Sequence, residues 1–431
     1  MSKEFKLENG AKVLCKAIPH AYSVSLGIYL TTRIVEEPLK LNGITHFLEH
    51  MSFKGTKKRT AKEIADILDS IGAQVNAHTA KEYTCYYLTV LSEKLFQGLE
   101  ILLDIVLNST LDQKDIDTEK KVVLEEINMY EDSPDENIHD IFASTLWHGH
   151  ELGRPILGAE KTIGNITKEN LEKFKNIYFN PKKMVISLAG NIPDEEKVIE
   201  KLNQILGSVQ EKETFPQNHV ALPTFCSRVN LQKKDTEQIH FCLGVQGIPY
   251  NHKDFFRLSV LSSIIGGTMS SRLFQNIREK EGYAYSIYSY PGFYKDTGLF
   301  SIYAGINKDK FLETLQLVLN EIKDLKENII SSYELKKTKE QFKGSFLIDL
   351  ENTSSWMSWQ ARSMIYKNKI DDIETIIQRI NDVTQKDIQE LAQQLFKTEN
   401  FALAAVGPFE DKKYPQENFQ KFITENQLSF T

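Results

Sequence analysis

Ile166-Thr-Lys-Glu-Asn-Leu-Glu-Lys-Phe-Lys-Asn-Ile-Tyr-Phe179 aligns without a gap on Val383-Thr-Gln-Lys-Asp-Ile-Gln-Glu-Leu-Ala-Gln-Gln-Leu-Phe396, at an offset of 217 residues. Each stretch opens with an apolar residue and a threonine, and threonine is a preferred N-cap of a helix. Apolar residues then recur at matching positions with the spacing of one helix face. In both copies a further apolar segment follows. We therefore interpret the sequence as two copies of a helix-then-strand unit.

The duplication divides the chain of 431 residues into two halves, each of the size of an ordinary domain. The matched segments end at Gly190 and Gly407, and the intervening residues 209–225 are mostly charged, polar or proline, as in a linker. We expect residues 1–208 and 226–431 to form homologous domains of the α+β class. Each is predicted to be a two-layer α/β domain, in which a mostly antiparallel sheet packs with helices.

Hydrophobic periodicity in the first half alternates between that of strands and that of helices. An Asn-Gly pair at residues 9–10 indicates a hairpin, and Thr60-Ala-Lys-Glu63 is a capping box that opens a helix. The pattern predicts strands at 22–32, at 74–91 with a turn near Lys81, and at 184–189. It predicts helices at 41–55, 60–72, 93–108, 112–130 and from 167 onward.

Composition excludes several classes of protein. Hydrophobic residues make up 41% and charged residues 26% of the chain, and the net charge is −7 without a polybasic segment. This composition indicates neither nucleic-acid binding nor attachment to an anionic membrane. We expect no secretory signal, because the first residues are charged and lack an apolar segment. No apolar stretch reaches transmembrane length, and the four cysteines form no CxxC pair. We expect a soluble, cytoplasmic protein with reduced thiols.

Residues 46–50 read His-Phe-Leu-Glu-His, the HxxEH order of inverzincins. On a helix, His46 and His50 lie one turn apart on one face, so both imidazoles can bind one zinc ion. Glu49 flanks the same face, where its carboxylate can act as general base on a zinc-bound water. The competing interpretation is a surface helix that happens to carry two histidines. The second half has no HxxEH, so only the first copy can hold this site.

A catalytic zinc site needs a third protein ligand. Glu119 and Glu126 are seven residues apart in a helical pattern and so share a face, while spacing alone does not rank Glu125 against Glu126. His78, in a strand-like segment, is a weaker rival. A solvated charged face beside neighbouring lysines is the alternative explanation for the glutamates.

Gly43-Ile-Thr-His-Phe-Leu-Glu-His-Met-Ser-Phe-Lys-Gly-Thr56 resembles the signature of the pitrilysin, insulysin and mitochondrial processing peptidase family. Residues 76–77, 119–127 and 152–158 match the family pattern in the same order, so the resemblance covers nearly the whole chain. The chain keeps HxxEH and has only two glycines at 266–267, which resembles the bacterial processing-peptidase type rather than the non-catalytic partner. The resemblance implies one zinc ion per chain, with Glu126 as third ligand and Glu119 assisting catalysis.

The resemblance also implies residues outside the metal site. The segment 271–285 resembles the part of the family's second half that supplies an arginine and a tyrosine, which places Arg278 and Tyr285 in the catalytic set, with Tyr283 ranked lower. It places Asn76 and Ala77 in substrate contact. An exposed strand edge there would pair with an extended peptide and exclude folded proteins.

We therefore expect a zinc metalloendopeptidase that hydrolyses short or unfolded peptides. The resemblance also implies a dimer, because this chain has two domains where large family members have four. We expect a homodimer, with a heterodimer still open. The alternative function is a non-catalytic peptide-binding or assembly subunit of the same fold. The sequence does not decide zinc against manganese or cobalt, because two histidines and a glutamate accept several divalent ions.

Overall fold

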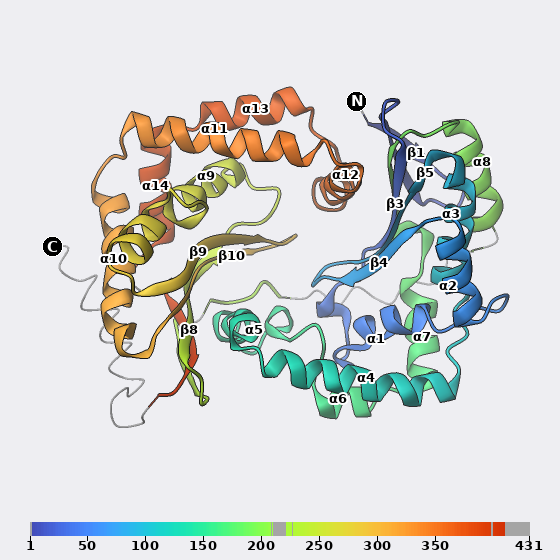
Figure 1. Cartoon of the computed structure of the whole chain (residues 1–431), viewed down its shortest axis with the longest axis horizontal. Coiled ribbons are helices and arrows are strands. Elements are labelled where there is room, and N and C mark those ends of the chain that lie inside the picture. Colours follow the sequence, from blue (N-terminus) through green and yellow to red (C-terminus); the bar gives the residue numbers. More distant parts are fainter. Residues whose placement is uncertain (1, 208, 210–220, 226, 398–399, 410–431) are drawn as a thin grey trace. The chain divides into compact units, whose positions relative to one another are not determined.

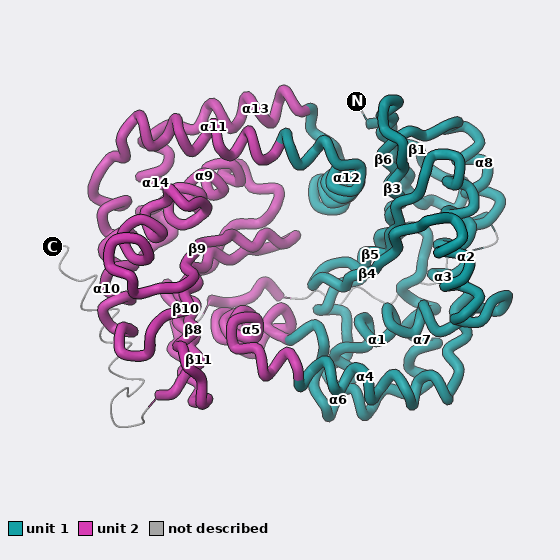
Figure 2. The backbone as a smooth tube through the Cα atoms, in the orientation of Figure 1, with its two compact units in different colours: residues 1–128, 155–220, 347–372 teal, residues 129–154, 221–346, 373–431 magenta. Residues whose placement is uncertain are grey.

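The computed structural model describes residues 2–207, 209, 221–225, 227–397 and 400–409 (Figure 1). Most of the predicted linker, 209–225, lies outside these residues. The chain divides into two compact units (Figure 2). The first contains residues 1–128, 155–220 and 347–372, and the second contains residues 129–154, 221–346 and 373–431. The predicted halves, 1–208 and 226–431, differ from these units by the exchange of segments 129–154 and 347–372.

The first unit holds, among its described residues, a six-stranded sheet in the order β1-β2-β6-β3-β5-β4. The β2–β6 pair is parallel and the other neighbours are antiparallel. The strands are β1 (Lys3–Lys6), β2 (Lys12–Ala17), β3 (Ser23–Leu30), β4 (Gln74–Thr79), β5 (Thr84–Leu91) and β6 (Met184–Gly190). β4 is therefore an edge strand, with no strand paired to its outer side among the residues that the structure describes.

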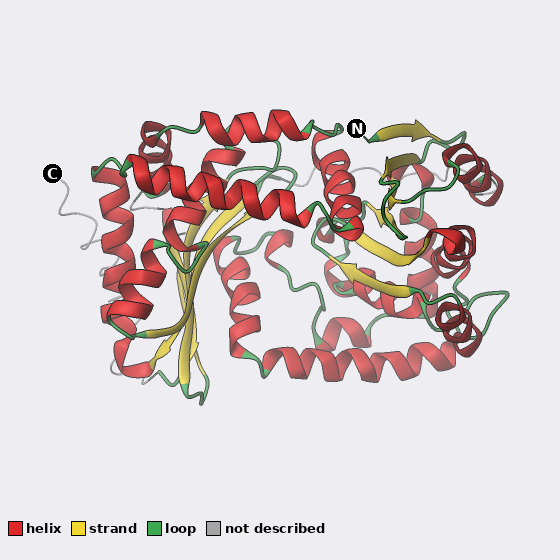
Figure 3. Cartoon of the chain, turned by 45° about the horizontal axis from the view of Figure 1, so that its top comes forward, coloured by secondary structure: helices red, strands yellow, loops and turns green. Residues whose placement is uncertain are grey.

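Helices pack on both faces of this sheet (Figure 3). The main core lies on one face, where apolar residues of the sheet pack against those of several helices. The helices whose residues belong wholly or mainly to this unit are α1 (Ile44–Ser52), α2 (Ala61–Ser70), α3 (Leu95–Asn108), α4 (Gln113–Glu131), α6 (Glu160–Gly164), α7 (Lys168–Tyr178), α8 (Glu195–Leu206) and α12 (Thr353–Lys367).

Helix α12 comes from the second half of the sequence but packs against β2, β3 and β6 of the first unit. Gln360 is fully buried there and donates to Ser187 Oγ and to the carbonyl of Leu188, each at 2.9 Å. Gly27 of β3 allows the close approach, because a Cβ at this position would lie 2.7 Å from Met357 Sδ. A second apolar cluster, distinct from the main core, forms beneath this helix.

The second unit repeats this plan with a five-stranded sheet, among the described residues, in the order β7-β11-β8-β10-β9. The β7–β11 pair is parallel and the rest are antiparallel. Its helix α5 comes from the first half of the sequence and packs on β8 and β11. The strands are β7 (Val229–Lys233), β8 (Gln238–Gly247), β9 (Ala284–Phe293), β10 (Gly298–Asn307) and β11 (Ala402–Gly407). The helices are α5 (Pro134–Leu146), α9 (Phe255–Gly266), the π-helix η6 (Phe274–Lys280), α10 (Phe311–Glu327), α11 (Ser332–Asp349), α13 (Ile373–Asp382) and α14 (Gln385–Leu395).

The predicted repeat corresponds to equivalent elements in the two units. α7 and α14 each begin after a threonine N-cap whose hydroxyl accepts from the third backbone N–H of the helix. The strands that follow, β6 and β11, both end at the matched glycines, Gly190 and Gly407. The fold class is thus confirmed: two sheets, mostly antiparallel and packed with helices.

Two further features of the described residues concern membrane-spanning helices and cysteines. No helix within the described residues combines the length and apolar character needed to cross a bilayer. Cys15, Cys85 and Cys242 are buried free thiols, and burial raises the pKa of each to about 12. These three thiols are therefore protonated and unreactive near neutral pH.

Candidate metal centre

The helix that carries the HxxEH residues is α1. Its apolar stripe, Ile44, Phe47, Leu48 and Met51, is buried in the main core of the first unit. The stripe recurs at helical spacing, as the sequence predicted, and it fixes the rotation of the helix. The other face presents His46, Glu49 and His50. The predicted residues are thus on a scaffolded helix and not on a solvated surface helix.

The three predicted ligand residues converge in the structure. His46 Nε2 and His50 Nε2 are 3.2 Å apart. Glu126 of α4 places its carboxylate oxygens 3.8 Å from His46 Nε2 and 3.4 Å from His50 Nε2. Within the described part of the chain, these three residues form the one cluster of histidine, cysteine or carboxylate groups whose ligand atoms all lie within 4.8 Å of one another.

This spacing fits a zinc ion. Two nitrogens bound to one tetrahedral zinc at about 2.0–2.1 Å are about 3.3 Å apart. The spacing of the two histidine nitrogens agrees with this value, and the glutamate oxygens are slightly farther away. Two imidazoles and one carboxylate with a remaining open position are the donor set of a catalytic zinc site. Glu125, the alternative that spacing left open, is exposed on α4 and is not in the cluster.

Glu119 contacts His50 through the ring nitrogen Nδ1. Its Oε1 lies 2.8 Å from His50 Nδ1, and its Oε2 lies 2.5 Å from Lys54 Nζ. The Glu119 side chain is only 3% exposed. A carboxylate that accepts from Nδ1–H leaves Nε2 as the metal-binding nitrogen, which is the usual partner arrangement of a ligating histidine. His46 differs, because its Nδ1 is buried without a hydrogen-bond partner among the described residues.

The two imidazoles have opposite pKa shifts. Burial, together with the nearby charge of His50, lowers the pKa of His46 to about 4. Burial also opposes a charge on His50, but hydrogen bonds with Glu119 and Glu126 outweigh it and raise the pKa of His50 to about 9. The same contacts, chiefly the hydrogen bond with His50, hold the pKa of Glu126 below its usual value. His46 is therefore neutral near pH 7, with a lone pair available for a metal.

Glu49 is half-buried beside the cluster and accepts a hydrogen bond from Thr79 Oγ1 at the end of β4. Burial raises the pKa of Glu49 above its ordinary value, and the bond from Thr79 opposes that shift. A carboxylate with a raised pKa is the better proton acceptor at neutral pH. Sequence reasoning missed Thr79, although the two-residue strand period places it on the same side of β4 as Ala77.

The predicted substrate residues lie on the free edge strand β4. Ala77 packs against the main core, while Asn76 is exposed and its Oδ1 accepts from the Ala77 backbone N–H at 2.8 Å. His78 lies outside the metal cluster, and its ring contacts Tyr83 and Tyr87 at centroid distances of 5.7 and 5.9 Å. His78 is thus not a ligand in this arrangement.

Arg278 and Tyr285 belong to the second unit, where they lie close together. The Arg278 guanidinium sits 5.8 Å from the ring centroid of Tyr285 and 4.7 Å from that of Phe274. Tyr285 is 77% exposed at the start of the edge strand β9. Tyr283 instead packs under Lys310, whose Nζ is 4.9 Å from its ring centroid. Of the two tyrosines, only Tyr285 is within cation–π distance of Arg278 in these contacts.

Known proteins resemble the chain over most of its length. The family profile described as Insulinase (Peptidase family M16) matches residues 12–160, and the profile described as Peptidase M16 inactive domain matches residues 165–342. The zinc protease YmxG of Bacillus subtilis, itself described as uncharacterised, is 40% identical over 95% of this chain and 98% of its own. A zinc protease of Streptomyces coelicolor, described in the same way, is 33% identical over 94% and 90% of the two chains.

Solved structures show the same fold. A protease from Helicobacter pylori superposes with a TM-score of 0.87 at 24% identity, covering 95% of this chain and 99% of its own. A structure from Pseudomonas fluorescens, described as a peptidase M16 inactive domain, gives a TM-score of 0.88 at 18% identity, over 95% and 98%. The profile matches and the extent of identity with the curated zinc proteases lead to one conclusion: this chain belongs to the insulinase family of peptidases, M16.

Proposed function

We propose that the protein is a zinc endopeptidase that cuts short or unfolded peptides, with His46, His50 and Glu126 as metal ligands. The observation that carries the proposal is the convergence of these three residues beside Glu49. A zinc ion held by these residues would supply Lewis acidity for the activation of a water molecule and of the substrate carbonyl. The zinc proteases among the relatives support this choice of metal.

The residues of the chain then have separate roles. Glu49 takes the proton of the attacking water as general base and later returns it to the leaving amine. Glu119 keeps His50 in the tautomer that binds metal through Nε2. Arg278 and Tyr285 are proposed to bind substrate and to steady the negative charge that develops on the carbonyl oxygen. This last role rests on the resemblance and on the contact between these two side chains.

The substrate is proposed to bind along β4. Its unpaired edge can add an extended peptide as a further strand, which only an unfolded segment can supply. The exposed Asn76 would exchange its bond to the Ala77 N–H for one with the peptide. We further propose that the enzyme works in the cytoplasm as a homodimer with one zinc per chain. Light scattering on the purified protein would measure the mass of the assembly.

The test compares the wild type with Glu49→Gln for zinc content and cleavage of an unstructured peptide. The variant keeps the size of the side chain but cannot accept a proton. We expect it to retain about one zinc per chain and to lose cleavage by a factor of at least about 100.

Glu125→Gln, on the exposed face of α4, is the matched control and should cleave like the wild type. Wild-type protein that folds but takes up no zinc would contradict the proposal. Zinc uptake without cleavage of any of a panel of unfolded peptides would favour the non-catalytic subunit instead.

A further inference from the structure

The start of helix α1 lacks a cap of its own. Its N-cap is Gly43, which has no side chain to accept from the first turn, and its φ of 95° lies in the left-handed region. The first backbone N–H groups of any helix have no acceptor within the helix. His46 is the third residue of α1, so this metal ligand stands in the turn that most needs an external acceptor.

That acceptor is Glu37. Its Oε2 accepts from the backbone N–H of Gly43 at 2.9 Å, and its Oε1 accepts from the N–H of Thr45 at 3.1 Å. The residue is only 5% exposed. Burial raises the pKa of Glu37, and hydrogen bonds from Thr45, Asn42 and Gly43 oppose this effect. One carboxylate thus caps two N–H groups on either side of the first helical residue.

Glu37 is itself held in place. Asn42 donates through Nδ2 to Glu37 Oε2 at 2.9 Å and to the carbonyl of Pro155 at 3.1 Å. Gly43 lies close to a neighbouring segment, since a Cβ there would lie 2.6 Å from the Leu157 carbonyl oxygen. The backbone entering α1 is therefore fixed from several sides.

His46 has particular need of this support. Glu119 orients His50 through Nδ1, but His46 Nδ1 has no hydrogen-bond partner among the described residues. Apart from the contacts of its Nε2 with His50 and Glu126, its ring direction therefore depends on packing and on the backbone of the first turn. From this difference we infer that Glu37 is a positioning residue for the metal centre, which fixes the first turn of α1 and through it the direction of the His46 imidazole.

This inference rests on the proposed metal site, so its test begins with metal binding and not with cleavage. Wild type, Glu37→Gln and Glu36→Gln are titrated with cobalt(II) and zinc as full-length protein. Glu36 is the matched control, because it precedes Glu37 but bonds to the N–H of Arg33 and to Lys183, not to α1. The visible absorption of bound cobalt reports the geometry of its ligands.

In Glu37→Gln, the NH2 group of the glutamine replaces one carboxylate oxygen, so one of the two backbone N–H groups faces a donor and loses its acceptor. We therefore expect this variant to bind zinc about tenfold more weakly and to change the cobalt spectrum at saturating metal. Glu36→Gln should match the wild type in both. Glu37→Asp keeps the charge and carries the test if the Gln variant does not fold. An unchanged spectrum and affinity, even with a lower melting temperature, would overturn the inference, because Glu37 would then only stabilise the fold. Failure of the wild type to bind either metal would identify the proposed function as the error.

Discussion

At the scale of single residues, the contact between Lys54 and the buried Glu119 carboxylate leads to a prediction about zinc affinity. Lys54 Nζ is 2.5 Å from Glu119 Oε2, and Glu119 also contacts His50. Without Lys54, the nearly inaccessible Glu119 carboxylate would lose the cation that pairs with its Oε2, and its contact with His50 would be less firmly held. We expect Lys54→Met to bind zinc about tenfold more weakly, as loss of a second-layer partner typically does. Competition with a metal chelator measures this constant.

Lys57 provides the control, because it is exposed three residues later in the same loop. Lys57→Met removes the same charge without touching Glu119, so its zinc affinity should equal that of the wild type. Equal losses in the two variants would mean that net charge, and not the contact with Glu119, sets the affinity.

Sequence reasoning reached some of these residues and missed others for a physical reason. Helical spacing placed His46 and His50 on one face, and the shared face of Glu119 and Glu126 also follows from spacing within one helix. The contacts of Thr79 with Glu49 and of Lys54 with Glu119 join different elements. No local period encodes such contacts, so they required the packed structure.

At the scale of elements, Asp104 ties helix α3 to the loop that follows α1. Its carboxylate accepts from Thr56 Oγ1 and Asn108 Nδ2, each at 2.8 Å, and pairs with Arg59. Burial alone would raise the pKa of Asp104, but the bonds from Asn108, Thr56 and Arg59 outweigh it and lower the pKa. The stabilisation is therefore fully present above the unfolded-state pKa of about 3.9 and is lost as the pH falls through the lower folded-state value.

We expect Asp104→Asn to lower the free energy of unfolding by about 1–2 kcal/mol near pH 7, with the difference from wild type shrinking below about pH 4. Urea unfolding of both proteins across pH 3–7 measures this difference. Because the two proteins share all other titratable groups, most contributions of those groups to the pH dependence cancel. Asp66→Asn, on the exposed face of α2, is the control. A difference that stays constant down to pH 3 would show that the charge of Asp104 is not involved.

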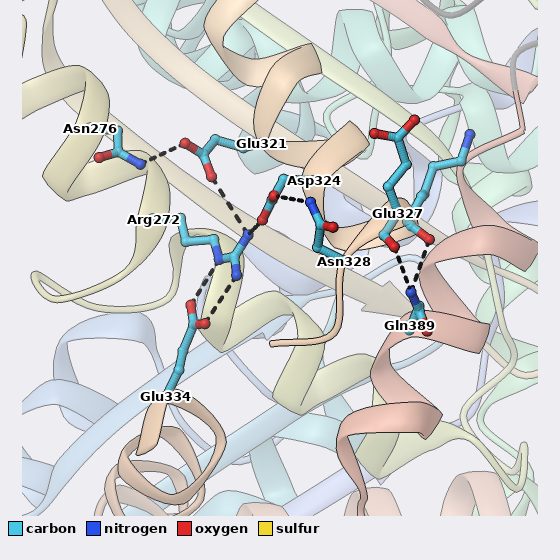
Figure 4. A network of polar contacts seen from close by, with 9 residues as sticks. Arg272, Asn276, Glu321, Asp324, Glu327, Asn328, Glu334 and Gln389 are labelled. Atoms are coloured by element: carbon cyan, nitrogen blue, oxygen red, sulfur yellow. Dashed lines mark hydrogen bonds and ion pairs between the residues drawn. The ribbon is translucent and has the colours of Figure 1, made fainter. Parts of the chain in front are cut away.

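Arg272 joins three elements of the second unit (Figure 4). It lies just before η6, donates to both oxygens of Glu334 on α11 at 2.8 and 3.0 Å, and donates to Asp324 on α10 at 2.6 Å. Its side chain is 15% exposed. A lysine offers one point charge and cannot satisfy two carboxylates in fixed directions.

We expect Arg272→Lys to lower the unfolding free energy by about 2–3 kcal/mol, less than the loss of a fully buried pair. The midpoint of thermal unfolding measures the effect. Arg228→Lys, at an exposed position of the same unit, should leave the midpoint unchanged. Equal midpoints for Arg272→Lys and wild type would mean that solvent replaces these contacts without loss.

At the scale of the whole molecule, the sequence predicted the duplicated domain but not the exchange of α5 and α12 between the two halves. The repeat is visible because α7 and α14 carry the same cap and apolar positions. The packing of α12 on the first sheet depends on Gly27 and Gln360, which are far apart in the sequence. The sequence pattern around either residue does not indicate that the two segments pack together. Sequence order therefore assigned residues 347–372 to the second domain, whereas they pack in the first unit.

This exchange leads to a prediction about the separate halves. Residues 1–208 expressed alone lack α12, which covers Leu14, Tyr29, Cys85 and Val185, all nearly inaccessible in the intact chain. Exposure of such a contiguous apolar face favours a loosely packed state or association. We expect this half to bind a hydrophobic dye, to unfold without cooperativity and to bind zinc weakly. Co-expression with residues 226–431 should restore cooperative unfolding and the zinc affinity of the full chain.

The control for this experiment is a full-length chain with a protease site inserted between residues 209 and 225. It folds with α12 in place before it is cut, so the two pieces should stay together and keep the metal site after cleavage. The comparison separates the break in the chain from the loss of the helix. If residues 1–208 alone unfold cooperatively and bind zinc like the intact protein, the first sheet does not need α12, and the sequence halves are the true folding domains.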